Sequence, residues 1–177
     1  MSFSLQQLFE KVLAKQRRVF VLFIDLTKAY DSVPRELLWG LLLKYGVPSE
    51  MVEVVKSLHE GMEARVRVGG KLSDVIEVRN GLRQGCTMSP VLFNLFFTAV
   101  MRMWRDECKD IEGFGIGVGY IVDEGRLKVG IKKDTGKEKR TKLTDMQFAD
   151  DAAAVATTRE ALELMAKKLI AVCKRWG

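Results

Sequence analysis

The feature that most constrains the fold is a short apolar run that ends at an acid. Residues 19–24 (Val-Phe-Val-Leu-Phe-Ile) are all aliphatic or aromatic, and Asp25 follows them directly. A run this short and this rich in β-branched and aromatic residues is typical of a central β-strand. A carboxylate at its end has a large desolvation cost unless it is paired or binds a metal. The alternative is an ordinary turn or capping aspartate.

A second acidic site interrupts another apolar stretch. Asp150 and Asp151 separate residues 143–148 from the small apolar residues 152–156. Adjacent carboxylates repel each other, although an Asp-Asp pair between strands can also be a simple tight turn. If the strands beside Asp25 and Asp150 are neighbours in a sheet, these acids converge at one edge. Such hard oxygen ligands suit Mg²⁺, and two carboxylate-held metals are the usual arrangement for phosphoryl transfer.

The rest of the pattern predicts a mixed α/β (α+β) fold. Helices separate the early strands and hairpins follow late in the chain, which favours a largely antiparallel sheet packed on helices. The Gly69-Gly70 pair predicts a two-residue hairpin turn, and Thr157 with Glu160 predicts a capping box. The expected helices are at about residues 4–16, 34–45, 48–60, 91–105 and 159–175. The further expected strands are residues 64–68, 72–78, 116–122, 127–131, 143–148 and 152–156.

Length and composition fit one domain, or a piece of a larger protein, in a reducing compartment. The chain has 177 residues and three cysteines that lie far apart, too few and too scattered for a disulfide framework or a zinc cluster. We expect an intracellular protein without a membrane partner, because no apolar run is long enough to span a bilayer and no secretory signal begins the chain. The sequence does not distinguish nucleus from cytoplasm. The single histidine, His59, lies in an expected helix, where a surface or packing role is favoured over catalysis.

The net charge is concentrated in one segment. Residues 126–142 contain eight basic and two acidic side chains, which accounts for the whole formal charge of +6. Such a segment can attract phosphate groups, or it can be a solvated hairpin edge whose lysines prevent strand association. The candidate nucleic-acid contacts are Lys132, Lys133, Lys139 and Arg140.

Three segments, in this order, resemble the motifs of the reverse transcriptase palm. They are residues 23–31 (Phe-Ile-Asp-Leu-Thr-Lys-Ala-Tyr-Asp), residues 81–90 (Gly-Leu-Arg-Gln-Gly-Cys-Thr-Met-Ser-Pro) and residues 148–151 (Phe-Ala-Asp-Asp). The amino-acid sequences of these motifs are most similar to those of the enzymes of non-LTR retrotransposons, whose relatives include group II intron maturases. The resemblance covers residues 19–177.

The resemblance assigns the acids to catalysis. It implies that Asp25 and Asp150 bind two Mg²⁺ ions, for which Mn²⁺ could substitute, with the backbone carbonyl of Leu26 as a further ligand. Asp151 is then a supporting carboxylate.

The resemblance also implies a nucleotide-binding pocket. Tyr30 would lie under the sugar and leave no room for a 2′-hydroxyl, unless it is an ordinary core tyrosine. Gln84 and Gly85 would pack on the incoming nucleotide and the template, or form a simple turn, and Arg83 would assist with phosphate or face solvent. The full set of implied nucleotide-binding residues is Leu26, Lys28, Ala29, Tyr30, Arg83, Gln84 and Gly85.

As a whole, the resemblance implies one incomplete reverse transcriptase domain. Residues 19–31 and 81–177 would form the palm, residues 32–80 part of the fingers and residues 1–18 an N-terminal helix, with the thumb absent. The expected activity is RNA-directed DNA synthesis from deoxynucleoside triphosphates on an RNA template with a DNA primer, by a piece of a larger polyprotein. The alternative is an inactive transposon-derived remnant that serves as a nucleic-acid-binding or interaction module.

Overall fold

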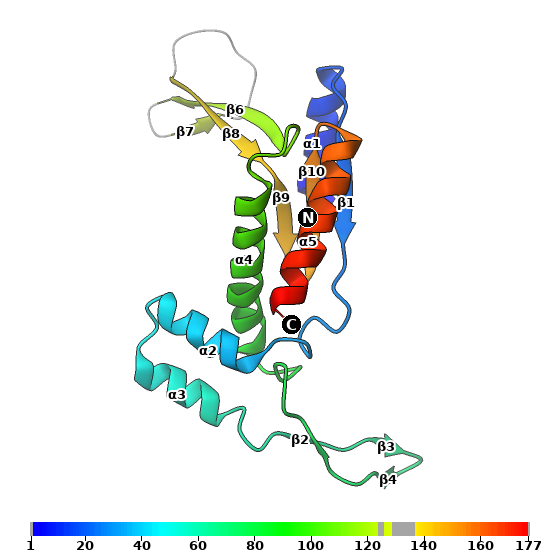
Figure 1. The fold of residues 1–177 in the computed structure, drawn as a ribbon, viewed down its shortest axis with the longest axis vertical. Helices are drawn as coiled ribbons and strands as arrows, with labels where there is room; N and C mark the ends of the chain where they lie inside the picture. The colour runs from blue at the N-terminus through cyan, green and yellow to red at the C-terminus, as the bar shows by residue number, and fades with distance from the viewer. Residues whose placement is uncertain (1, 124–125, 129–136, 177) are drawn as a thin grey trace. The chain divides into compact units, whose positions relative to one another are not determined.

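A computed structural model describes residues 2–123, 126–128 and 137–176 of the chain (Figure 1). The chain divides into two compact units. The first unit comprises residues 1–25 and 105–169, and the second comprises residues 26–104 and 170–177. The fold is mixed α/β and every described strand pair is antiparallel, as the sequence predicts.

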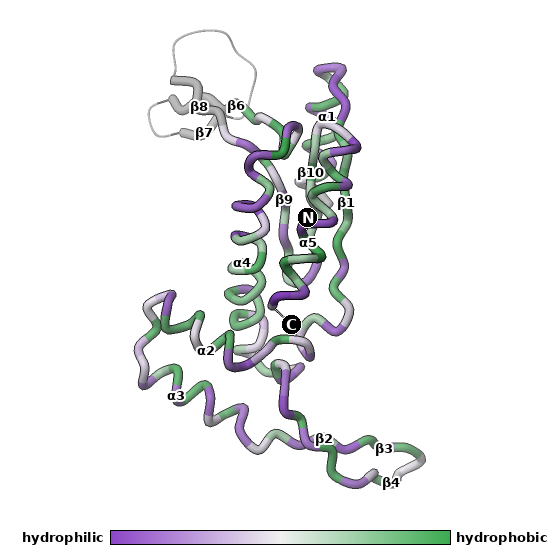
Figure 2. The backbone as a smooth tube through the Cα atoms, in the orientation of Figure 1, coloured by the Kyte–Doolittle hydropathy of each residue, from purple (hydrophilic) through white to green (hydrophobic). Residues whose placement is uncertain are grey.

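The first unit is built around a three-stranded sheet. Its order is β1 (Phe20–Ile24), β10 (Asp151–Ala156) and β9 (Asp145–Phe148), with β10 in the centre. The three strands run side by side in Figure 1, and Figure 2 shows β1 as a hydrophobic stretch. The strand that ends before Asp25 therefore neighbours the strand that begins at Asp151, which is the condition under which the sequence analysis expects Asp25 and Asp150 to converge.

A helix covers one face of this sheet. Leu8 and Val12 of α1 (Ser2–Ala14) form a buried cluster with Val155 of β10 and with Ile116, and Val21 and Met146 pack against the cluster. The side chains of β10 from residue 152 to residue 156 are all at most 1% exposed, so both faces of this central strand are covered. Small side chains, mostly alanine, make this close packing possible.

The first unit also holds a second antiparallel sheet, of order β7-β6-β8. Strands β6 (Ile116–Asp123) and β7 (Arg126–Lys128) form the predicted late hairpin, whereas β8 (Lys137–Leu143) was not expected from the sequence. Strand β8 ends one residue before Thr144, so the stretch predicted as a single strand over residues 143–148 is divided between β8 and β9.

Two of the four candidate basic contacts belong to this second sheet. Lys139 and Arg140 belong to β8, where their backbones pair with Tyr120 and Gly119, respectively. Lys132 and Lys133 lie outside the described residues, so their proposed contact with nucleic acid stays a prediction.

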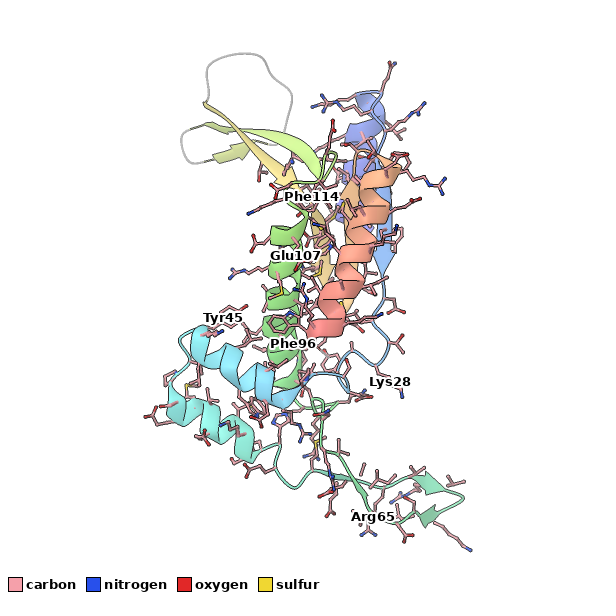
Figure 3. The ribbon with its side chains drawn as sticks, in the orientation of Figure 1. Lys28, Tyr45, Arg65, Phe96, Glu107 and Phe114 are labelled. Carbon is pink, nitrogen blue, oxygen red and sulfur yellow. The ribbon has the colours of Figure 1, made fainter. Side chains whose placement is uncertain are left out.

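The second unit consists of helices and a β-ribbon. Its helices are α2 (Arg35–Lys44), α3 (Ser49–Ser57) and α4 (Ser89–Cys108) up to Trp104. The ribbon pairs β2 (Glu63–Ala64) with β5 (Ile76–Glu77) and, nearer its tip, β3 (Arg67–Val68) with β4 (Lys71–Leu72). Figure 3 shows the side chain of Arg65 on this ribbon. Gly69 and Gly70 both have positive φ, as the predicted two-residue turn requires.

Helix α5 (Arg159–Trp176) begins with a different cap from the one the sequence predicts. The backbone N–H of Ala161 donates to the hydroxyl of Thr158 at 3.2 Å, whereas the hydroxyl of Thr157 donates to the carbonyl of Gly113 at 3.3 Å. The predicted capping box at Thr157 and Glu160 is therefore wrong, because Thr157 is used in a tertiary contact. Within the described residues, no helix has both the length and the apolar character needed to cross a membrane.

Candidate active site

The end of the three-stranded sheet carries three aspartates. Strands β9 and β10 are joined by a two-residue turn, because Phe148 pairs with Asp151 and only Ala149 and Asp150 lie between them. Ala149 has a φ of +56° and Asp150 has no positive φ, which is the pattern of a type II′ turn. Glycine is the usual residue at the first position of that turn, so an alanine there is strained. Backbone strain of this kind is concentrated at functional sites.

The sheet register brings Asp25 to the same end. Ile24 pairs with Ala152, and Asp25 and Asp151 each lie one residue beyond that pair. If the register continues by one residue, Asp25 lies beside Asp151, with Asp150 in the adjoining turn. Asp25 and Asp151 are exposed, and Asp150 is half-buried. Like charges on neighbouring strands are unfavourable, so this end of the sheet favours a bound cation.

A fourth acid in the same unit has a different environment. The side chain of Asp145 in β9 is only 2% exposed, and it accepts hydrogen bonds from Thr144 at 2.6 Å and Gln147 at 2.6 Å. Arg105 forms an ion pair with it at 3.1 Å. In contrast, among the described side chains no Lys or Arg forms an ion pair with Asp25, Asp150 or Asp151. Asp145 is a structural acid, and the other three are free to bind a ligand.

The side chains of Asp25, Asp150 and Asp151 are chemically suited to bind a hard divalent cation. These side chains provide carboxylate oxygens as ligands, and the candidate metal ligands include no histidine or thiolate. The side chains are not preassembled, however: in the part of the chain that the structure describes, no group of three or more His, Cys, Asp or Glu residues is arranged to hold a metal ion.

Tyr30 is the candidate gate residue, because the resemblance places it where its ring would exclude a 2′-hydroxyl, and it belongs to the second unit. The ring of Tyr30 stacks on Phe93 of α4 with centroids 4.9 Å apart and an interplanar angle of 21°, and Phe93 stacks in turn on Phe97 at 5.7 Å. Tyr30 is half-buried, whereas Phe93 and Phe97 are almost fully buried. Tyr30 is thus supported from one side by an aromatic column that limits how far its ring can move.

The loop of residues 81–85 is fastened to the segment that carries Tyr30. The N–H of Leu82 donates to the carbonyl of Tyr30 at 2.8 Å, and the N–H of Gly81 donates to the carbonyl of Val33 at 3.1 Å. The side-chain amide of Gln84 also donates to Asp31 at 3.2 Å. The second motif is therefore held to the end of the first motif, and to Val33 just after it, by three hydrogen bonds.

The remaining candidates around this loop differ in exposure. Gly85 has a φ of +82° and open space where a Cβ would be, so its backbone is accessible to a ligand. Arg83 is exposed, Leu26 is half-buried and Ala29 is buried. Lys28, labelled in Figure 3, is exposed and has a φ of +53°.

The start of α4 makes Cys86 the most acidic thiol of the three described. The backbone N–H groups of Met88, first, and of Ser89 lower the pKa of the Cys86 thiol, and Arg83 acts in the same direction. Burial raises the pKa of Cys108 to about 11 and also raises that of Cys173. Ser89 itself is buried and donates to the carbonyl of Arg83 at 2.7 Å, which closes the loop onto the helix start.

The structural contacts of two residues at this site could not be recognised from the sequence. Arg35, the first residue of α2, donates to backbone carbonyls on either side of the second motif's start, and Gly81 lies in contact with the backbone of Asp31. The sequence predicts the start of a helix at Pro34-Arg35, but no nearby residue indicates that Arg35 contacts the carbonyls of Asn80 and Gly81. The buried His59 donates from Nδ1 to the carbonyl of Val55 at 2.8 Å and meets the edge of Trp39, which agrees with the packing role predicted for it.

Comparison with known proteins identifies the family. Residues 2–177 match the family described as reverse transcriptase (RNA-dependent DNA polymerase), so the chain belongs to the reverse transcriptase family. It is 25% identical over 154 residues to the Pol polyprotein of the type-2 retrotransposable element R2DM of Drosophila melanogaster, covering 87% of this chain and 12% of that protein.

Two further relatives are also retrotransposon proteins. The chain is 24% identical over 173 residues to the Pol polyprotein of the type-1 element R2 of Nasonia vitripennis, covering 98% of this chain and 14% of the relative. It is 30% identical over 87 residues to the corresponding protein of Popillia japonica, covering 49% of this chain and 14% of the relative. The chain spans only 12% to 14% of the length of these three relatives. The predicted resemblance to non-LTR retrotransposon reverse transcriptases is confirmed.

Proposed function

We propose that this chain is an RNA-directed DNA polymerase module that adds deoxynucleotides to a primer 3′-hydroxyl with the help of two divalent cations. The observation that carries the proposal is the antiparallel sheet register. Ile24 pairs with Ala152, so Asp25, which follows Ile24, and Asp151, which precedes Ala152, both lie at the sheet end beside the turn that contains Asp150. Membership of the reverse transcriptase family supports the reaction class.

In this proposal the acids at the sheet end hold the cations. Asp25 and Asp150 would bind two Mg²⁺ ions, or Mn²⁺ in their place, with the carbonyl of Leu26 as a further ligand. Asp151 would keep the local charge negative enough to attract them. When bound, the ions supply Lewis-acid activation of the primer 3′-oxygen and neutralise charge on the triphosphate. The separate burial of Asp145 under Arg105 excludes that acid from the role.

The nucleotide pocket is assigned to the segments around Tyr30 and Gly85. The Tyr30 ring, stacked on Phe93, would exclude a 2′-hydroxyl and so favour deoxynucleotides. Gly85 would let the backbone approach the base, with Gln84 beside it, while the exposed Lys28 and Arg83 would face the phosphates. Ala29 is buried, so any contact from it would come through its backbone.

The proposal extends to the partners and to the arrangement of the domain. We assign residues 19–31 and 81–177 to a palm and residues 32–80 to part of the fingers, working on an RNA template with a DNA primer. The relatives are polyproteins several times longer than this chain, which supports its being one piece of such a protein.

Primer extension on an RNA template tests the proposal. With Mg²⁺ and deoxynucleotides, the chain should extend an annealed DNA primer, and Asp150→Asn should abolish incorporation. Asp110→Asn is the matched control, because Asp110 is an exposed aspartate of the same unit. The proposal would be refuted if the wild-type chain extends no primer, or if Asp150→Asn and Asp110→Asn extend equally.

A second candidate is a non-catalytic module that binds nucleic acid. It is favoured by one observation, namely that the described acidic side chains form no preassembled group for a metal ion. The same assay distinguishes the two candidates, because this alternative predicts no incorporation together with retained binding of an RNA–DNA hybrid.

A further inference from the structure

The side chain of Arg35 joins three separate segments of the second unit. Its Nε donates to the carbonyl of Gly81 at 2.8 Å, one Nη donates to the carbonyl of His59 at 2.9 Å, and the other donates to the carbonyl of Asn80 at 3.4 Å. Arg35 begins α2 and His59 follows the end of α3. Asn80 precedes the second motif, and Gly81 is its first residue.

The acceptors around this guanidinium are all neutral. Three are backbone carbonyls and the fourth is the thioether sulfur of Met62, to which an Nη donates at 3.7 Å. Among the described side chains no carboxylate forms an ion pair with Arg35. The residue is half-buried, and desolvation lowers the pKa of its guanidinium. A partly desolvated charge is stable here because several oriented carbonyl oxygens replace its water.

Gly81 is the point through which this contact reaches the candidate nucleotide pocket. Its carbonyl accepts from Arg35, and its N–H donates to the carbonyl of Val33 at 3.1 Å. The next residue, Leu82, donates to the carbonyl of Tyr30 at 2.8 Å, and Tyr30 stacks on Phe93. A change in the position of Gly81 would therefore be transmitted to the backbone of Tyr30.

We propose that Arg35 is a positioning residue that fixes the Gly81–Leu82 backbone against Tyr30 and so sets the discrimination between deoxyribose and ribose. Its consequence for catalysis rests on the proposed polymerase function. Arginine suits this role because its planar guanidinium presents five N–H donors in a fixed geometry, which one ammonium group cannot reproduce.

The first test is amide hydrogen exchange in the 177-residue chain, which needs no catalytic activity. Removing hydrogen bonds from a charged donor should accelerate exchange of the Gly81 and Leu82 amides about tenfold or more in Arg35→Met. Exchange within residues 93–101 of α4 should keep its wild-type rate. Arg35→Lys keeps the charge and much of the packing, so it should be intermediate, and it serves as the test if the methionine variant fails to fold.

Arg79→Met is the control variant. Arg79 is another arginine of the same unit, but its side chain is 84% exposed and pairs with Glu77. It should leave exchange at Gly81 and Leu82 unchanged. Unaltered exchange at these two amides in Arg35→Met would overturn the proposal. Equal acceleration throughout α4 would also overturn it, because Arg35 would then have only a general structural role.

The second test is sugar selectivity in primer extension. The ratio of kcat/KM for a deoxynucleotide to that for the matching ribonucleotide should fall several-fold in Arg35→Met and recover in part in Arg35→Lys. An unchanged ratio would refute the link between Arg35 and the gate. A wild-type chain that extends no primer would refute the proposed function instead, and the exchange experiment would still decide whether Arg35 holds the loop.

Discussion

Gly81 lies directly against the backbone of Asp31. A Cβ added to Gly81 would come within 2.6 Å of both the Cα and the carbonyl oxygen of Asp31, and the φ of Gly81 is +81°. Only glycine satisfies both conditions, because backbone atoms at that distance cannot move aside without disrupting the segment that carries Tyr30. The start of the second motif is thereby fixed to the end of the first by close approach as well as by hydrogen bonds.

Gly81→Ala should therefore destabilise the protein much more than Gly85→Ala. Both glycines have positive φ, but Gly85 has open space around its missing Cβ. We expect a decrease in the free energy of unfolding of roughly 3 kcal/mol or more for Gly81→Ala, from overpacking plus backbone strain, against about 1 kcal/mol for Gly85→Ala. Urea unfolding of the two variants measures the difference, and equal decreases would contradict the close contact with Asp31.

Cys86 should react with alkylating reagents well before the other two cysteines. The backbone N–H groups of Met88 and Ser89 lower the pKa of its thiol, so the reactive thiolate forms at a lower pH than for an ordinary cysteine. Burial raises the pKa of Cys108 to about 11 and also that of Cys173, which keeps both as thiols near neutral pH. Iodoacetamide labelling from mildly acidic to mildly alkaline pH, followed by peptide mass spectrometry, measures the order. Labelling of Cys173 at the same rate as Cys86 would be inconsistent with it.

Tyr30→Val should admit ribonucleotides in a chain that is active in primer extension. Removing the ring makes room for a 2′-hydroxyl, which the ring of Tyr30 is proposed to exclude. Tyr30→Phe is the matched control, because it keeps a ring that can stack on Phe93 and should keep the selectivity. The measurement is the ratio of deoxynucleotide to ribonucleotide incorporation. Unchanged discrimination in Tyr30→Val would remove the gate assignment.

The basic segment can be tested through the salt dependence of binding. Replacement of Lys132, Lys133, Lys139 and Arg140 by glutamine should weaken binding of an RNA–DNA hybrid and flatten the plot of log affinity against log salt. The slope should change by about 0.9 for each phosphate that the variant no longer neutralises, by the value for duplex DNA. A control variant should replace four exposed lysines elsewhere, namely Lys11, Lys15, Lys44 and Lys109. Equal slopes for the two variants would show that the segment is only a solvated edge.

The sequence was sufficient to predict elements with strong local patterns. Strand β1 and helices α1 to α5 follow from apolar runs, helical periodicity and helix-start signals, and the Gly69-Gly70 turn from its composition. Strand β8 was missed because five of the seven residues of Lys137–Leu143 are charged, so the segment has no apolar face, and only pairing with β6 makes it a strand. The same limit explains the wrong cap, since Thr157 and Thr158 are locally equivalent until Gly113 is brought near.

The sequence was sufficient to propose the candidate acidic residues, but not the sheet register and the hydrogen bonds that position the surrounding segments. Asp25, Asp150 and Asp151 interrupt apolar strands, which is a signal visible in the sequence alone. Their shared sheet end depends on the register between β1 and β10, which joins segments far apart in the chain. Arg35 could not be recognised because its carbonyl partners lie 24 to 46 residues away. Its role therefore required three-dimensional information.

The central claim is that Asp25, Asp150 and Asp151 together bind divalent cations, and Mn²⁺ binding tests it most directly. Electron paramagnetic resonance of free Mn²⁺ should show saturable binding by the wild-type chain that Mg²⁺ displaces, and binding should be abolished in both Asp25→Asn and Asp150→Asn. The control Asp110→Asn should bind as the wild-type chain does. Undiminished Mn²⁺ binding in the Asp25 and Asp150 variants would contradict the account.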